Sequence, residues 1–233
     1  MKAHADEDRA IRFWAAWSAA LLGEPHKVLP VLQAFALAAS LFRDRAARIL
    51  FKVEAPRRAL ELLRTVAQNP ADIRALIQAV GIAGDPHHVP WLIEQMSDLT
   101  LARLAGESFS FITGLDLATL DLERARPEGI RLGPTDAPED EDVAMDPDDG
   151  LPWPDPEKIQ KWWETHRHDL PAGVRHFMGK PPAWEHCLDV LRNGYQRQRI
   201  AAAEYLCLLR PGTRLFNTAA PAWRQKRLLD RMT

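Results

Sequence analysis

The sequence predicts an all-α protein, a solenoid of antiparallel helix pairs that is interrupted by an acidic, irregular insert containing proline and tryptophan. The first observation is a repeat: four arginines with similar surroundings stand 31, 31 and 29 residues apart, and a fifth follows 96 residues later. The second is that apolar residues recur at helical spacing between glycine and proline turn signals. A period near 30 residues is typical of solenoids, in which each helix pair buries its apolar face against its neighbours. The arginines are Arg12, Arg43, Arg74, Arg103 and Arg199.

Two further positions recur with the arginines. A leucine stands eleven residues before each of the last four, and a large apolar residue stands six residues after each. Arginine is common in this chain, so the joint recurrence of three residue types supports the repeat better than the arginines alone. The leucines are Leu32, Leu63, Leu92 and Leu188, and the large apolar residues are Ile49, Val80, Phe109 and Tyr205.

The first 114 residues are expected to be helical throughout. Gly23-Glu24-Pro25 and Gly84-Asp85-Pro86 each predict a helix end followed by a helix start, because glycine adopts the left-handed cap and proline fits a first turn. Asn69-Pro70 and Ser97-Asp98 mark turns inside pairs. Helices are expected over 9–22, and as pairs over 28–38 with 42–52, 56–67 with 71–82, and 88–97 with 100–114.

The repeat stops after Gly114. Leucines alternate with acidic residues over 115–123, which fits a short strand, an irregular edge or a helix. The acidic, proline-rich stretch 134–156 favours disorder or an extended loop. A helix near 156–167, a short strand with a turn over 173–179, and helices over 182–192, 196–209 and 220–231 follow. We therefore divide the chain into repeats over 1–114, an irregular insert over 115–181 and C-terminal helices over 182–233, packed on the same solenoid.

One helix pair carries a pattern of its own. Its residues are Gly84-Asp85-Pro86, Val89, Leu92, Ile93, Met96, Asp98, Arg103, Ala105, Phe109, Ile112 and Gly114. They resemble a HEAT repeat of the short type found in phycobilisome-lyase-like proteins. In such a repeat Asp98 would cap the second helix, and Arg103 would reach neighbouring carbonyls or the next repeat's aspartate. The chain departs from the pattern at Gly106-Glu107-Ser108, where a small apolar run is usual. This departure predicts either a less regular helix or a close approach of the backbone, which Gly and Ser permit.

The later part of the chain resembles one family more specifically. The residues are Leu151-Pro152-Trp153-Pro154-Asp155-Pro156, Trp162-Trp163, Arg175 with Gly179, and the run over 191–229. They are similar to an uncharacterised proteobacterial family of HEAT-repeat-containing proteins, and the resemblance covers most of the chain from about Arg12. Members tend to be encoded near type VI secretion genes and have no assigned activity. Because members are often longer at the N-terminus, the resemblance implies that leading repeats are missing here. It carries over no functional residue.

Composition excludes several classes of partner. Lys and Arg total 30 against 32 Asp and Glu, so a net charge of -2 gives no global reason to expect nucleic acid or an anionic membrane. The acidic start is unlike a secretory signal, and every long apolar run is broken by proline or polar residues. Cys187 and Cys207 could pair, but two cysteines in a chain of this length favour buried thiols in a reducing compartment. A cytoplasmic protein is expected.

The sequence offers no convincing catalytic, cofactor or metal residues. His87-His88 and the pair His166 and His168 lack a cysteine or carboxylate at ligand spacing. His186 and Cys187 are adjacent, and adjacent residues on a helix point away from one another. No nucleophile elbow and no glycine-rich phosphate loop is present. An enzyme is therefore not expected.

Two features are candidates for binding another protein. Trp14 and Trp17 on the first helix are expected either to pack on the second helix or to meet a partner or the missing repeats. The acidic stretch is either a solvated loop or a charge mimic that occupies a basic groove on a partner such as a nuclease toxin. The candidate partner-binding residues are Asp136, Glu139, Asp140, Glu141, Asp142, Asp146, Asp148, Asp149, Trp14 and Trp17.

These observations lead to one expected function and one alternative. We expect a protein-binding HEAT-like module, an accessory of type VI secretion that binds an effector or toxin. The alternative is an immunity protein that neutralises a co-encoded toxin, such as a nuclease, through its acidic surface.

Overall fold

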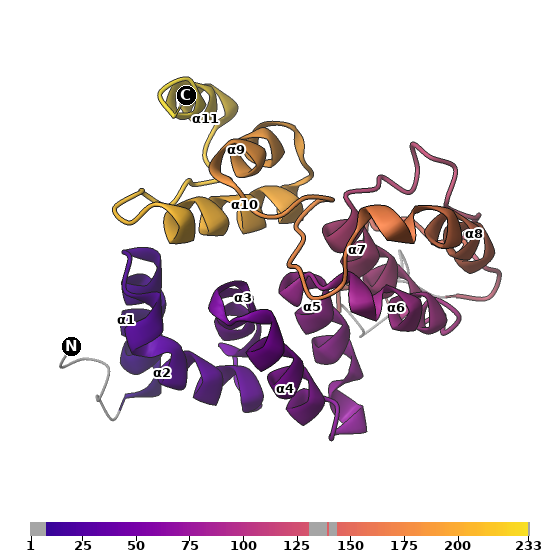
Figure 1. Ribbon diagram of the computed structural model, residues 1–233, viewed down its shortest axis with the longest axis horizontal. Helices are drawn as coiled ribbons and strands as arrows, with labels where there is room; N and C mark the ends of the chain where they lie inside the picture. The colour runs from indigo at the N-terminus through magenta and orange to yellow at the C-terminus, as the bar shows by residue number, and fades with distance from the viewer. Residues whose placement is uncertain (1–7, 131–138, 140–143, 233) are drawn as a thin grey trace.

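The computed structural model describes residues 8–130, 139 and 144–232, and over these residues the protein is all-α (Figure 1). Short 3₁₀ turns, η2 (Pro70–Asp72), η3 (Pro86–His88) and η4 (Arg167–Asp169), join some of the helices. The helices are α1 (Arg9–Leu21), α2 (Pro25–Leu37), α3 (Arg43–Val53), α4 (Pro56–Val66), α5 (Ile73–Ala83), α6 (Val89–Gln95), α7 (Ala102–Thr113), α8 (Pro156–His166), α9 (Trp184–Asn193), α10 (Gln196–Leu209) and α11 (Ala222–Leu229).

The helices expected from the sequence are confirmed, with ends that differ by a few residues. The largest difference at a helix start is α2, which begins at Pro25, because this proline takes the first turn and Pro30 is tolerated inside the helix. The prediction of a short strand over 173–179 is wrong, and of the three alternatives for 115–123 the structure shows the irregular edge. Both segments are irregular, and within the described residues each contributes one isolated bridge, Glu123 with Pro154 and Phe177 with Lys180.

Local capping explains why the helices begin and end where they do. Gly84 ends α5 with φ +73°, and the Asp85 side chain accepts a hydrogen bond of 2.9 Å from the His87 N–H. Asp8 accepts from the Ala10 N–H at the start of α1, and Asp155 accepts from the first-turn N–H groups of α8. Each cap supplies a partner to backbone donors that a helix start leaves free.

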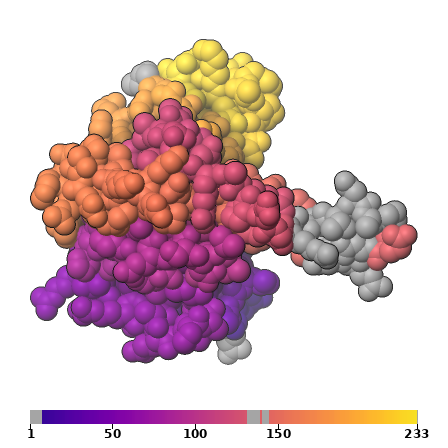
Figure 2. Space-filling view, turned by 90° about the vertical axis from the view of Figure 1, so that its right-hand side faces the viewer, coloured from indigo at the N-terminus to yellow at the C-terminus, as the bar shows by residue number. Residues whose placement is uncertain are grey.

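The helices pack mainly on their neighbours along the chain. α1, α2 and α3 pack in succession, α5 lies against α3, α4 and α7, α6 packs on α7, and α9 packs on α10. One apolar cluster extends from Phe13 on α1 to Ile159 on α8, while a second is centred on α9 and α10. α10 crosses above α1 and α3 (Figure 1), and the C-terminal helices lie at the opposite end from α1 to α4 (Figure 2).

The repeated arginines serve the fold. Arg43 Nε donates to Ala36 O (3.3 Å), and Arg199 Nε makes the equivalent bond to Leu191 O (2.8 Å). Arg43 Nη1 also lies 2.5 Å from Asp72 Oδ1, about one repeat further along the chain. These bonds tie α3 to the end of α2, α10 to the end of α9, and α3 to Asp72 just before α5.

Small residues let α5 and α7 approach closely. A Cβ added to Gly81 would lie 2.9 Å from the Ser108 Cβ, and Ser108 Oγ donates to Ile77 O (3.0 Å). The close approach expected at Gly106-Glu107-Ser108 is thus confirmed for Ser108, whereas the irregular helix expected there is wrong, because α7 is continuous over Ala102–Thr113.

A short segment over 173–180, called the strap below, crosses the C-terminal ends of three helices. Arg175 donates to Ala83 O on α5 (3.2 Å), to Lys52 O on α3 (2.5 Å) and to Glu54 O just beyond α3. The Met178 N–H donates to Phe111 O on α7 (2.7 Å). The last carbonyls of a helix have no partner within it, so the strap supplies donors that the helices lack.

Candidate functional site

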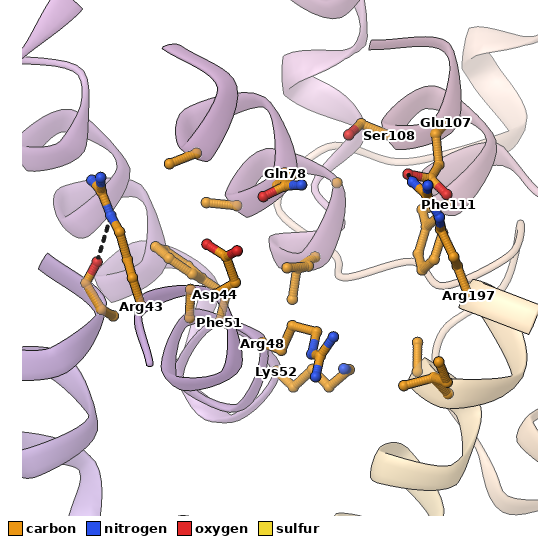
Figure 3. A pocket seen from close by; sticks show the side chains of 18 of the residues that line it. Arg43, Asp44, Arg48, Phe51, Lys52, Gln78, Glu107, Ser108, Phe111 and Arg197 are labelled. Carbon is orange, nitrogen blue, oxygen red and sulfur yellow. Dashed lines mark hydrogen bonds and ion pairs between the residues drawn. The ribbon is translucent and has the colours of Figure 1, made fainter. Parts of the chain in front are cut away.

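An inner cavity of about 330 Å³ lies between α3, α5, α7 and α10 (Figure 3). Most of its surface is apolar, and charged side chains stand at its two ends. The apolar lining residues are Ala36, Ala47, Phe51, Val66, Ala75, Ala79, Gly81, Ile82, Phe111, Phe177, Ile200, Ala201 and Tyr205.

The space exists because small side chains line it and because α10 spans it from one side. Ala47 on α3 and Ala75 and Ala79 on α5 face the cavity, where larger residues would fill it. α10 packs on α9 and reaches α1 and α3, so room remains between α10 and the pair of α5 and α7. The cavity is therefore a consequence of how the C-terminal helices rest on the first helices.

Three charged side chains meet at one end of the cavity. Lys52 on α3 is buried and forms an ion pair with Glu204, a buried residue of α10. Arg48 Nε lies 3.3 Å from the other oxygen of the same carboxylate. Burial lowers the pKa of Lys52, although the Glu204 charge and hydrogen bond oppose this effect. One carboxylate therefore serves two cations and joins α10 to α3.

An ion pair also closes the other end. Arg197 on α10 lies 2.8 Å from Glu107 on α7, and its second nitrogen donates to Pro147 O (2.9 Å). Burial raises the pKa of Glu107, while Arg197 opposes the shift. This pair and the Lys52–Glu204 pair hold α10 in place at both ends of the cavity.

The middle of the cavity presents polar groups that bind no other group of the fold. Asp44 on α3, which is exposed, and Gln78 on α5, which is half-buried, lie there, and the Arg48 guanidinium lies near them (Figure 3). Within the described part of the chain, neither the Asp44 carboxylate nor the Gln78 amide has a hydrogen-bond partner. Such groups can recognise a ligand that carries its own donors and acceptors.

The acidic candidates of the insert divide into three groups. Asp148 is buried and lies 2.6 Å from Arg74, while Asp146 lies 2.7 Å from Arg103. Both carboxylates therefore bind arginines of this fold, and this end of the insert does more than form a solvated loop. Glu139 and Asp149 are exposed. Asp136, Asp140, Glu141 and Asp142 lie outside the described residues.

The aromatic candidates on α1 are only partly covered. Trp14 is 42% exposed, and its ring packs against Trp17 and Phe42. Trp17 is half-buried against the first apolar cluster. The structure thus gives both tryptophans packing contacts, and it leaves part of the Trp14 face open.

The histidines and cysteines form no recognisable reactive centre in the described residues. No group of three metal-binding side chains gathers there. His186 Nε2 lies 2.7 Å from Phe177 O. Cys187 and Cys207 are buried free thiols, as expected, and burial raises the pKa of Cys187 to about 12 and that of Cys207 to about 11. A thiol needs a lowered pKa to act as a nucleophile at neutral pH.

Sequence reasoning missed the residues around the cavity. Glu204 stands in the apolar run Ala201-Ala202-Ala203-Glu204-Tyr205, and Lys52 follows Ile49-Leu50-Phe51. A charged residue on an apolar face predicts a buried partner. That signal could have identified both residues, but not their pairing, because 152 residues separate them.

Comparison of the chain with protein-family models, with curated proteins and with solved structures found no match. Among the helices that the structure describes, none has the length and apolar character needed to cross a membrane.

Proposed function

We propose that this protein is a protein-binding module, a HEAT-like solenoid of antiparallel helix pairs whose inner cavity holds a segment of a partner protein. The observation that carries the proposal is the combination of an apolar floor with unpaired polar groups in the middle of the same cavity. Apolar pockets with a few convergent polar groups are the usual form of a binding site. The repeated arginines are structural, so they leave recognition to the cavity.

The cavity is suited to anchor side chains rather than a whole interface. Its volume of about 330 Å³ is at the small end of ligand pockets. A few anchors in well-packed pockets carry most of the binding energy of a protein interface. The partner would therefore insert a short segment, and surrounding surface would add specificity.

The proposed context is bacterial type VI secretion, in which the protein would act in the cytoplasm as an accessory that binds an effector or toxin. This rests on the family resemblance of the C-terminal half. The immunity alternative requires a free acidic surface. Since Asp146 and Asp148 bind Arg103 and Arg74, that surface would have to use other acidic residues of the insert. Our first proposal is therefore the accessory role, in which the protein acts as an adaptor that binds an effector without neutralising it.

The cavity can be tested by filling it. Ala75 on α5 lines the cavity, and Ala75→Phe would occupy its space, whereas Ala10→Phe adds the same group at an exposed position of α1. Peptides would be selected from a phage-displayed random library on the purified protein, and their affinities measured by fluorescence polarisation. We expect at least about tenfold weaker binding to A75F and unchanged binding to A10F. Equal binding to both variants would show that the cavity is not the site.

The biological role needs a separate experiment. The protein would be co-expressed with effectors encoded beside its gene, and both complex formation and toxicity would be measured. An adaptor binds the effector and leaves its toxicity intact, whereas an immunity protein suppresses it. Failure to retain any such effector at physiological salt would contradict both roles.

A further inference from the structure

We infer that the inner cavity captures the C-terminal residue of a partner polypeptide, with an apolar side chain on the cavity floor and the terminal carboxylate on Arg48. This inference rests on the proposed function and specifies its ligand. Three observations lead to it: the unused hydrogen-bond donors of Arg48, the free groups of Asp44 and Gln78, and the size of the apolar floor.

Arg48 is the cation of the cavity with the most unused hydrogen-bonding capacity. Arg43 donates to Ala36 O and pairs with Asp72, and Arg197 pairs with Glu107 and Pro147 O. Arg48 has only the 3.3 Å approach of its Nε to Glu204, and this buried Nε makes no hydrogen bond among the described residues.

Arg48 has no carboxylate to itself. It shares Glu204 with Lys52, and among the described residues it forms no ion pair with Asp44, the other carboxylate in this part of the cavity. A ligand carboxylate can therefore bind the guanidinium nitrogens of Arg48 that make no hydrogen bond. A guanidinium can hold a carboxylate through two parallel hydrogen bonds, which makes arginine well suited to this task.

Asp44 and Gln78 favour a polypeptide over other amphipathic carboxylates. A fatty acid offers an apolar chain and a carboxylate but no further donors. A peptide also offers backbone N–H and C=O groups, which the Asp44 carboxylate and the Gln78 amide can accept from and donate to. Both side chains lie around the same part of the cavity as Arg48 (Figure 3).

The apolar floor suits one terminal side chain better than a helix. Ala47, Ala75 and Ala79 leave room on the α3 and α5 side of the lining, and the cavity of about 330 Å³ accepts a leucine-, methionine- or phenylalanine-sized group with part of the preceding backbone. Capture of a chain terminus is one of the established modes of peptide recognition.

The test compares free and blocked termini. A library of random peptides with free C-termini would be selected on the full-length protein, and the best binder would be synthesised as acid and as amide. Fluorescence polarisation would then measure both forms against wild type, Arg48→Gln and Arg48→Lys. The control variant is Arg45→Gln, which removes an exposed arginine of α3 that lies over the Trp14 ring instead.

We expect the amide to bind wild type about tenfold or more weakly than the acid. R48Q should weaken the acid to a similar extent and leave the amide unchanged, R48K should retain part of the difference, and R45Q should behave as wild type. Melting curves by circular dichroism would show that all variants are folded.

Three outcomes would overturn the inference. If peptides bind in a cavity-dependent manner but acid and amide bind equally, the terminus is not recognised, although the proposed function survives. If octanoate binds through Arg48 and no peptide does, the ligand is a fatty acid. If neither a free-terminus library nor an internal-peptide library yields a binder that A75F weakens, both the inference and the proposed function fail.

Discussion

Glu204→Gln would remove the single carboxylate that Lys52 and Arg48 share. Lys52 is buried, so the variant leaves a buried ammonium group without a counter-ion. Removing one partner of a buried ion pair costs about 3 to 5 kcal/mol. Loss of the carboxylate beside Arg48 adds less to this cost in stability, because the Arg48 side chain is 34% exposed and can reach water. We expect a loss of about 3 kcal/mol in the free energy of unfolding, measured by urea denaturation at neutral pH with far-ultraviolet circular dichroism.

The effect should depend on pH in a defined direction. Burial already lowers the pKa of Lys52 in the folded state, and loss of Glu204 lowers it further. The unfolded chain then binds the Lys52 proton more tightly than the folded chain, so stability rises with pH between the folded and unfolded pKa values. We therefore expect the difference in the free energy of unfolding between wild type and E204Q to shrink as the pH rises toward the ordinary pKa of lysine.

A double variant separates the charge effect from packing. Lys52→Met combined with Glu204→Leu replaces the buried pair by apolar groups and should recover most of the lost stability. The reasoning would be refuted by an E204Q variant within about 1 kcal/mol of wild type, or by a double variant as unstable as E204Q.

Three more predictions concern the fold. Arg175→Ala should lower the free energy of unfolding by about 1 to 3 kcal/mol, because three helix-end carbonyls lose their donor, while the exposed Arg192→Ala should change it little; equal effects in urea denaturation would contradict the role of the strap. Gly81→Ala should cost about 1 to 3 kcal/mol by forcing α5 away from α7, and an unchanged melting temperature would rule out the close contact. Cys187 and Cys207 should resist iodoacetamide in the folded protein at mildly alkaline pH and react after denaturation, which mass spectrometry would detect; rapid labelling of the native protein would disprove their burial.

Local signals allowed much of the helical pattern to be predicted from the sequence. Gly84-Asp85-Pro86 specified an end and a start within three residues, and both were found. Arg103 was expected to reach neighbouring carbonyls or the aspartate of the next repeat, and it does bind a carbonyl, that of Asp148. The aspartate it pairs with, Asp146, belongs to the insert and not to a next repeat. The alternating leucines over 115–123 left a strand, an irregular edge and a helix open, and the structure shows the irregular edge, which buries Leu117 and Leu122.

The candidate site could not be predicted in the same way. Its walls come from α3, α5, α7 and α10, and the contact of α10 with α3 depends on a pair of residues 152 positions apart. The strap is equally non-local, since Arg175 binds carbonyls 92 to 123 positions earlier. Single residues in one sequence carry no signal for such pairings. Periodicity therefore identified the helices, and only the packing of distant segments revealed the cavity.

Two of the repeated arginines bind the insert. Arg43 reaches Asp72, whereas Arg74 and Arg103 reach Asp148 and Asp146 of the insert. The insert is therefore joined to α5 and α7 by side chains that belong to the repeat. Displacing this end of the insert would leave both arginines without their carboxylates, so the insert and these two helices are expected to unfold together.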